Sequence, residues 1–322
     1  MKKAIVLFIV FILFSSFMFG AGIEEERRVA EKTYPSRPIN VIIPWAAGGG
    51  TDVTARGFLK VAEKYVGATF VPTNITGGAG AVGWASGKNA EADGYNLVIL
   101  TADYLTHSIK HTSGISIDDF IPIINISKYP ACLAVDANSP WKDFESFIAD
   151  AKKNPGTIQI GNSGIGGSNH QAALMIEEAT GAEFIHVPFS GGALSIAAVL
   201  GGNIEASLAN TPEISPRSDM RMLVQHASGE RNASALDTPT LKELGYDVDF
   251  ESFRMIGVLK DTPPERVKFL DEKFKQAWKD PEFQEFAKAG DLSPEFLNAE
   301  ESKKLLNNMY EQISYIINKY KL

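Results

Sequence analysis

Residues 39–52 read Ile-Asn-Val-Ile-Ile-Pro-Trp-Ala-Ala-Gly-Gly-Gly-Thr-Asp, an apolar run that leads into a glycine-rich loop. The run Ile39–Ile43 predicts a strand, and apolar residues at nearly helical spacing predict a helix over Val53–Tyr65. A glycine-rich loop at the start of a helix directs several free backbone N–H groups at one point, where an anion can bind. The stretch therefore predicts an α/β fold with an anion site behind its first strand.

Two more loops of this kind follow predicted strands. Residues 163–170 (SGIGGSNH) follow the strand Thr157–Ile160, and residues 189–193 (FSGGA) follow Phe184–Val187. None of the three loops contains Lys or Arg, so we expect backbone amides and hydroxyl groups to hold the anion, with apolar side chains beside it. The hydroxyls are those of Thr51, Ser163, Ser168 and Ser190, and the apolar side chains are Trp45 and Phe189. Glycines that only permit tight turns are the alternative interpretation.

Motifs for other chemistry are incomplete. No loop reads G-x-G-x-x-G or ends in Gly-Lys-Ser/Thr, which argues against a nucleotide site. Residues 161–165 (GNSGI) lack the last glycine of a nucleophile elbow. His107 and His111 have the spacing of a helical metal pair but no intervening Glu and no third ligand. We expect His170 to brace the second loop by a hydrogen bond, and we predict no cofactor, no metal and no catalytic residue.

The N-terminal residues are typical of a secretion signal. Lys2 and Lys3 precede an apolar stretch that reaches Phe19, and small residues follow at 20–22. We expect residues 1–22 to be removed on export and the mature chain to be periplasmic or extracytoplasmic; an uncleaved membrane anchor is the alternative.

The charge of the chain restricts its partners. The sequence has 31 Lys and Arg against 39 Asp and Glu, a net charge of −8, which becomes −10 without residues 1–22. An acidic chain of this kind argues against nucleic acid as a partner. The single cysteine, Cys132, lies in an apolar run and is predicted to be a buried small hydrophobic residue.

Strands and helices alternate on both sides of a long extended stretch, Phe120–Val135, which predicts two α/β lobes with a ligand cleft between them. We expect the first lobe to comprise residues 23–127 and 247–322, and the second lobe residues 128–246. The return crossing is Met222–His226 or a segment near residue 247. Apolar stripes predict core-facing helices after Pro264 and at the C-terminus.

The chain resembles the substrate-binding proteins of tripartite tricarboxylate transporters, the TctC-type or Bug family of periplasmic receptors. The likeness covers nearly the whole mature chain and rests on the order and number of short motifs. They are Tyr34–Ile39, Pro44–Asp52, Gly77–Gly80, Asp93–Tyr95, Ser163–His170, His186–Gly192, Leu200–Asn203, Asp237–Thr240 and Gly257–Pro264.

The resemblance implies a two-lobe periplasmic binding protein of type II-like fold, each lobe a mostly parallel sheet flanked by helices, with two crossing strands as a hinge. It implies a non-catalytic, monomeric receptor that closes on a small di- or tricarboxylate or another carboxyl-bearing metabolite. The receptor would deliver this ligand to a membrane permease of a large and a small subunit. The alternative is a two-lobe binding protein for an amino acid or another small anion that serves another transporter or a sensor; an enzyme on the same scaffold is a third hypothesis.

Two departures from the family pattern bear on the ligand. Residues 101–107 read TADYLTH where the family has small residues before Thr-His, and Trp45 replaces the usual Phe. We hypothesise that Asp103 or Tyr104 reaches the cleft, where an acid would favour a ligand with an amino group. The alternative is that Asp103 caps the following helix. The residues expected to bind the ligand are Trp45, Ala46, Ala47, Gly48, Gly49, Thr51, Thr101, Tyr104, Ser163, Gly167, Ser168, Phe189, Gly191 and Asn210.

Overall fold

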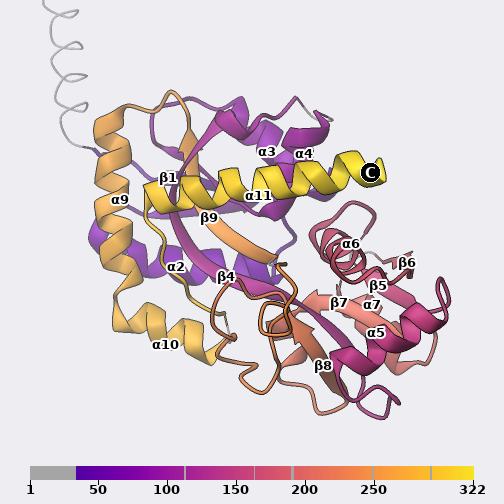
Figure 1. Cartoon of the computed structure of the whole chain (residues 1–322). Coiled ribbons are helices and arrows are strands. Elements are labelled where there is room, and N and C mark those ends of the chain that lie inside the picture. Colours follow the sequence, from indigo (N-terminus) through magenta and orange to yellow (C-terminus); the bar gives the residue numbers. More distant parts are fainter. Residues whose placement is uncertain (1–33, 112–113, 163, 190–191, 249, 291) are drawn as a thin grey trace, which may run out of the picture.

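The computed structural model describes residues 34–111, 114–162, 164–189, 192–248, 250–290 and 292–322 (Figure 1). The predicted signal, residues 1–22, lies outside the described residues. Within the described part, no helix is long and apolar enough to cross a membrane.

The first sheet has the strand order β2-β1-β3-β9-β4. Strand β1 pairs in parallel with β2 and β3, and β9 runs antiparallel to both β3 and β4. The strands are β1 Ile39–Ile43, β2 Phe70–Asn74, β3 Asn96–Leu100, β4 Phe120–Asp136 and β9 Glu251–Leu259.

The second sheet has the order β4-β7-β5-β6, with β8 on the other side of β4. Strand β5 is parallel to β6 and β7, whereas β7 and β8 run antiparallel to β4. These strands are β5 Gln159–Asn162, β6 Ile185–Pro188, β7 Ala206–Asn210 and β8 Met220–Gln225.

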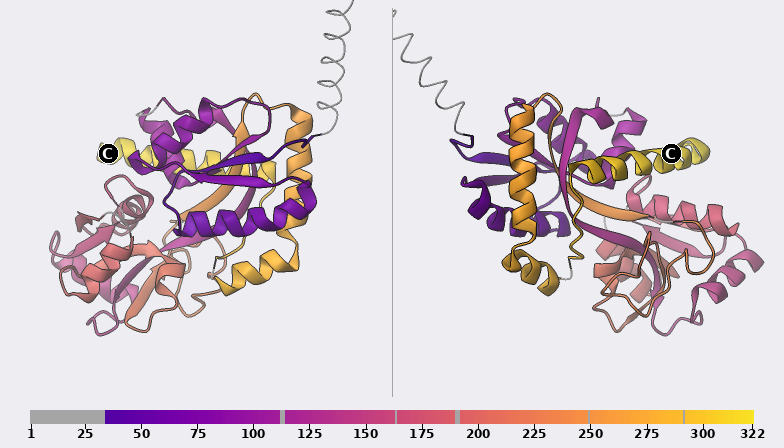
Figure 2. Two further views of the ribbon diagram at one scale, coloured as in Figure 1. Left: turned by 180° about the vertical axis from the view of Figure 1, so that it is seen from behind. Right: turned by 60° about the vertical axis from the view of Figure 1, so that its left-hand side comes forward.

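Strand β4 belongs to both sheets. Its residues 120–130 pair with β9, and residues 131–136 pair with β7 and β8. Figures 1 and 2 show the resulting two bodies joined through this strand. The predicted α/β two-lobe class is confirmed. Each sheet is mixed rather than mostly parallel, because β4 and β9 run against their neighbours. The lobe boundaries at 127/128 and 246/247 stay predictions.

Helices cover both faces of the first sheet. The helices are α2 Gly50–Val66, α3 Ala81–Lys88, α4 Ala102–Lys110, α9 Pro264–Trp278, α10 Pro281–Ala289 and α11 Ala299–Tyr320. Side chains of β3 alternate between the two covers: Leu97 and Ile99 pack with α2, α9 and α10, and Val98 and Leu100 with α3, α4 and α11. Phe58 of α2 meets Phe274 and Phe283 edge-on, with ring centroids 5.5 and 5.1 Å apart.

Helices of the second sheet pack in the same alternating way. They are α5 Phe144–Lys153, α6 Ser168–Thr180, α7 Gly192–Leu200 and the single turn α8 Thr211–Ile214. In β4, Leu133 and Val135 contact the core with α5 and α6, whereas Cys132 and Ala134 contact the cluster with α7 and α8. Cys132 is completely buried, as predicted.

Most predicted elements are present with ends shifted by one to three residues. Helix α2 ends at Gly67, whose φ of 75° is left-handed and whose N–H donates to the carbonyl of Glu63. The stripe on α11 faces the core, as expected, through Leu306, Met309 and Ile313. Helix α10 and the extent of α4 were not predicted from the sequence.

Candidate functional site

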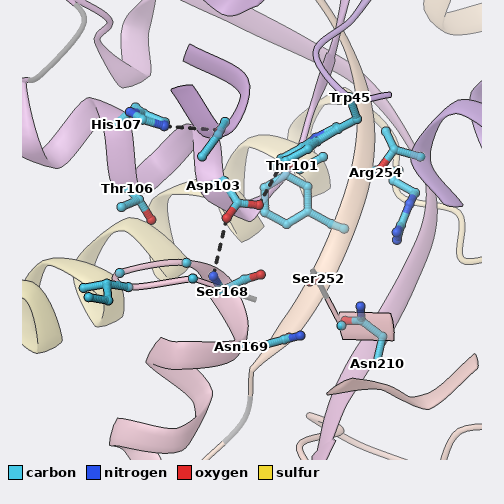
Figure 3. Close-up of a pocket in the computed structure, with 18 of the residues that line it drawn as sticks. Trp45, Thr101, Asp103, Thr106, His107, Ser168, Asn169, Asn210, Ser252 and Arg254 are labelled. Atoms are coloured by element: carbon cyan, nitrogen blue, oxygen red, sulfur yellow. Dashed lines mark hydrogen bonds between the residues drawn. The ribbon is translucent and has the colours of Figure 1, made fainter. Parts of the chain in front are cut away.

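A cavity of about 430 Å³ lies between the two sheets, and its wall takes residues from both (Figure 3). Its volume is typical of a site for a small molecule. Six predicted ligand-binding residues line it: Trp45, Thr51, Thr101, Gly167, Ser168 and Asn210. Two more, Ser163 and Gly191, lie outside the described residues.

The first loop is held in shape by a carboxylate. Asp52 accepts hydrogen bonds from Gly48 N–H at 2.9 Å, Arg56 Nε at 2.7 Å and Asn74 Nδ2 at 2.8 Å. Burial by itself would raise the pKa of Asp52, but these three donors outweigh burial and lower the pKa. The carboxylate is therefore a charged brace that positions Trp45 and Thr51 at the cavity.

The middle of the first loop does not form the cavity wall in this structure. Ala46, Ala47, Gly48 and Gly49 are exposed and lie outside the lining, so their predicted contact with a ligand stays a prediction. Gly49 is the N-cap of α2 and has no side chain to satisfy the first-turn N–H groups. The start of α2 therefore offers unsatisfied donors beside Thr51.

Two other predicted residues are corrected. Tyr104 is fully buried in the core, with its ring against Trp84 and Phe120 and its hydroxyl donating to the carbonyl of Ser116. Phe189 packs on the cluster around Cys132. Neither side chain is part of the cavity wall: Tyr104 fills space in the apolar core, and Phe189 is half-buried against the cluster.

Asp103 reaches the cavity from α4. The N-cap of this helix is Thr101, so the expectation that Asp103 occupies the capping position is wrong. The two oxygens of Asp103 accept from Ser168 N–H and Thr101 Oγ1, both at 3.4 Å (Figure 3). Burial raises the pKa of Asp103 above its ordinary value of 3.8, and these donors offset the effect only in part.

The second loop is braced as predicted. His170 Nδ1 accepts from Gly166 N–H at 2.9 Å, which fixes the neutral ring with its proton on Nε2. Burial, and then the neighbouring His186, lower the pKa of His170 to about 4. Gln171 Nε2 donates to the carbonyl of Gly166 at 2.8 Å and to Thr106 Oγ1 at 2.7 Å, so it ties α6 to α4.

The structure adds a charged residue that sequence reasoning missed. Arg254 of β9 lines the cavity with only 9% of its surface exposed, and its Nε and Nη1 are buried without a hydrogen-bond partner. Its guanidinium lies 3.9 Å from the centroid of the Tyr129 ring. The cavity wall therefore contains a buried cation in addition to the neutral donors expected from the loops, and which of these groups hold an anion stays a prediction.

Arg254 also lies against the start of α2. A Cβ built on Gly50, the first residue of that helix, would be 3.6 Å from Arg254 Nη2. The N-terminus of a helix carries a partial positive charge, so a buried cation beside it is unfavourable unless an anion lies between them. Burial accordingly lowers the pKa of Arg254.

Acidic side chains face the same space. The negative charges of Glu213 and Asp103 both act on Arg254. Glu213 Oε2 accepts from the backbone N–H of Asn210 at 2.8 Å and from its side chain at 3.0 Å. Unpredicted lining residues are Arg254, Glu213, Asn169, Ser252, His107 and Lys110, together with several small or apolar ones.

Two observations describe the metal-binding and thiol chemistry of the described residues. These residues include no group of three His, Cys, Asp or Glu side chains able to bind a metal ion. Cys132 is completely buried, and burial raises the pKa of its thiol well above the ordinary value. The cavity wall therefore combines a buried guanidinium, the uncapped start of a helix and two carboxylates.

A family model and a curated relative match most of this chain. The family model described as "Tripartite tricarboxylate transporter family receptor" matches residues 54–322. A Cupriavidus necator protein, "UPF0065 protein in gbd 5'region", is 30% identical over 292 residues, which cover 89% of this chain and 88% of the relative.

Solved structures give the same result. A TctC solute-binding protein from Polaromonas, solved without ligand, is 32% identical, with a TM-score of 0.80 and coverage of 89% of this chain and 100% of the other. An R. palustris protein solved with adipate is 22% identical, with a TM-score of 0.77 and coverage of 89% and 98%, and shares the fold.

Proposed function

This chain belongs to the TctC family of tripartite tricarboxylate transporter receptors, and we propose that it binds a small carboxylate in the cavity between its two sheets. A solute receptor needs a site that holds its ligand without transforming it. The delivery of the carboxylate to a membrane permease of a large and a small subunit is part of the proposal. So are the periplasmic or extracytoplasmic location and the absence of catalysis.

One observation carries the proposal. Arg254 is buried beside the N-terminus of α2, and two of its donor nitrogens have no partner. A carboxylate would accept two hydrogen bonds from the guanidinium and would neutralise a charge that is otherwise desolvated. The same anion would also accept hydrogen bonds from the free N–H groups at the start of α2, whose N-cap Gly49 lacks a side chain.

The remaining predicted residues take secondary roles in this proposal. Trp45, Thr51, Thr101, Ser168 and Asn210 would shape the cavity and orient the ligand. The protein solved with adipate supports a dicarboxylate as one ligand class to test.

The test is direct. The mature protein is purified without added ligand, denatured, and the released small molecules are identified by mass spectrometry. The emptied, refolded protein is then titrated calorimetrically with succinate, malate and adipate, and with the corresponding diamides as controls. A released or titrated carboxylate that binds while its amide does not is the expected result. Binding of no carboxylate in either experiment would refute the proposed function.

A further inference from the structure

The cavity brings together side chains of opposite charge. Arg254 supplies one buried cation, and Asp103 and Glu213 supply two carboxylates whose fields act on it. In Figure 3, Arg254 and Asp103 enter the cavity from different walls. Asp103 comes from α4 beside the first sheet, and Glu213 from α8 beside the second.

Both carboxylates keep capacity to accept further hydrogen bonds. A carboxylate offers about four lone-pair positions. The two contacts of Asp103 are each 3.4 Å long, and those of Glu213 to Asn210 use one oxygen, Oε2. The other oxygen, Oε1, would lie 2.9 Å from a Cβ built on Gly192, another residue of the cavity wall. Each carboxylate can therefore accept from a ligand.

These charges disfavour a ligand that carries only negative groups. With both acids ionised the three side chains sum to a charge of −1, so a dicarboxylate would bring the site to −3, whereas a zwitterion would leave it at −1. The other basic residues of the wall do little to change this sum. Lys110 is exposed in the last turn of α4, and the His107 ring contacts the carbonyl of Ala79 at 3.2 Å.

We infer that the cavity selects a carboxylate that also carries a protonated amino group, with Arg254 binding the carboxylate and Asp103 and Glu213 the ammonium. The inference rests on the proposed function and narrows its ligand class. Ammonium N–H groups are strong donors without acceptor capacity, so they complement two carboxylates. A carboxylate at the same place would be repelled by both.

A purely structural role for the two acids makes a different prediction. Asp103 lies at the first turn of α4 and accepts from the first N–H of α6, and Glu213 satisfies the Asn210 backbone. If this were their whole role, their neutralisation would change the affinity for every ligand by the same factor. The inference instead requires that the change depend on the amino group of the ligand.

The experiment uses matched ligands on the mature protein. Calorimetry compares malate with aspartate, which differ by a hydroxyl and an amino group, and adipate with 2-aminoadipate and 6-aminohexanoate. We expect the amino member of at least one pair to bind 10-fold or more tightly, and the molecule released from the purified protein to contain a basic nitrogen. Equal or weaker binding of every amino member, or a released carboxylate without such a nitrogen, overturns the inference and leaves the proposed function intact. Binding of no carboxylate at all refutes both.

Two conservative variants test whether Asp103 and Glu213 bind the ammonium group of the ligand. In Asp103→Asn the amide oxygen can still accept from Ser168 N–H, and the amide nitrogen can donate to the Thr101 hydroxyl. In Glu213→Gln the amide oxygen can keep both hydrogen bonds from Asn210, so each variant is expected to fold. Each should reduce the preference for the amino member by about 3- to 10-fold, with the affinity for the plain carboxylate unchanged or raised. Glu243→Gln is the matched control, because Glu243 accepts from Thr240 N–H at 2.8 Å in the same local geometry and lies outside the cavity wall. An unchanged preference in both cavity variants contradicts the assignment.

Discussion

Replacement of Arg254 by Gln separates binding from folding. In the free protein the guanidinium is desolvated, has two unpartnered nitrogens and lies beside the positive end of α2. Its removal costs the contact with the Tyr129 ring, about 0.5–2 kcal/mol. It also relieves an unpaired buried charge, an effect of several kcal/mol in the opposite direction. We therefore expect the free energy of unfolding to stay unchanged or to rise.

The affinity for a carboxylate should fall sharply. Hydrogen bonds to charged groups contribute about 1.5–3 kcal/mol each, and the loss of one partner of a buried charged pair costs about 2–5 kcal/mol. A loss of about 3 kcal/mol corresponds to roughly 100-fold in the dissociation constant. The assay is calorimetric titration with the carboxylate identified in the purified protein, combined with urea unfolding without ligand.

Arg221→Gln is the control, for which we expect a loss of stability without a loss of affinity. Arg221 donates to the carbonyls of Trp141 at 3.1 Å and Ala137 at 2.6 Å, so its loss leaves acceptors unpaired and costs about 1–3 kcal/mol of stability. The affinity of this variant should not change, because Arg221 lies outside the cavity wall. If Arg254→Gln instead destabilises the free protein by several kcal/mol and keeps the affinity for the carboxylate within about 3-fold, the inference that Arg254 is a buried cation that binds the carboxylate is refuted.

Three further predictions concern the frame of the site. Folding lowers the pKa of His170 from 6.5 to about 4. Between these two pH values the unfolded chain binds a proton at His170 that the folded protein does not, so the free energy of unfolding should drop by up to about 3 kcal/mol as the pH is lowered from 6.5 to 4. In His170→Gln, where an amide oxygen can accept from Gly166 N–H, unfolding at pH 7 and 4.5 should show a smaller drop, and an equal drop would exclude His170 as its source. A Cβ on Gly161 would lie 2.2 Å from Ser195 Oγ, so Gly161→Ala should lower the unfolding free energy by about 1–3 kcal/mol; an unchanged melting temperature would contradict this. Tyr104→Phe should cost about 1 kcal/mol of stability and leave ligand affinity unchanged, and a selective loss of affinity would return Tyr104 to the binding site.

Short-range patterns in the sequence were sufficient for much of the fold. The alternation in Ile39–Ile43 and the glycines behind it predict a strand and a helix start, because both signals depend on neighbours in the chain. The position of Cys132 and the core-facing stripe of α11 follow from local apolar context in the same way.

The composition of the site depends on pairing between distant segments. Arg254 reaches the first loop only because β9 pairs with β3 and β4, which no local pattern encodes. One signal was present: a lone cation, Arg254, interrupts the apolar run from Phe253 to Leu259, and a buried charge of this kind needs a partner. The burial of Tyr104 could not be predicted from its neighbours in the sequence either, because it depends on Trp84 and Phe120, which belong to other elements.

The two sheets that share β4 are completed at different points along the chain. The strands of the second sheet follow one another from residue 120 to residue 225, whereas the first sheet needs strands from residue 39 to residue 259. Contacts between distant segments form late because closing a long loop costs entropy. During synthesis, which begins at the N-terminus, one edge of β3 therefore stays unpaired until the residues of β9 have been made. An incomplete chain that ends before Glu251 would keep this apolar edge open to other chains, which makes it the point where aggregation is expected to begin.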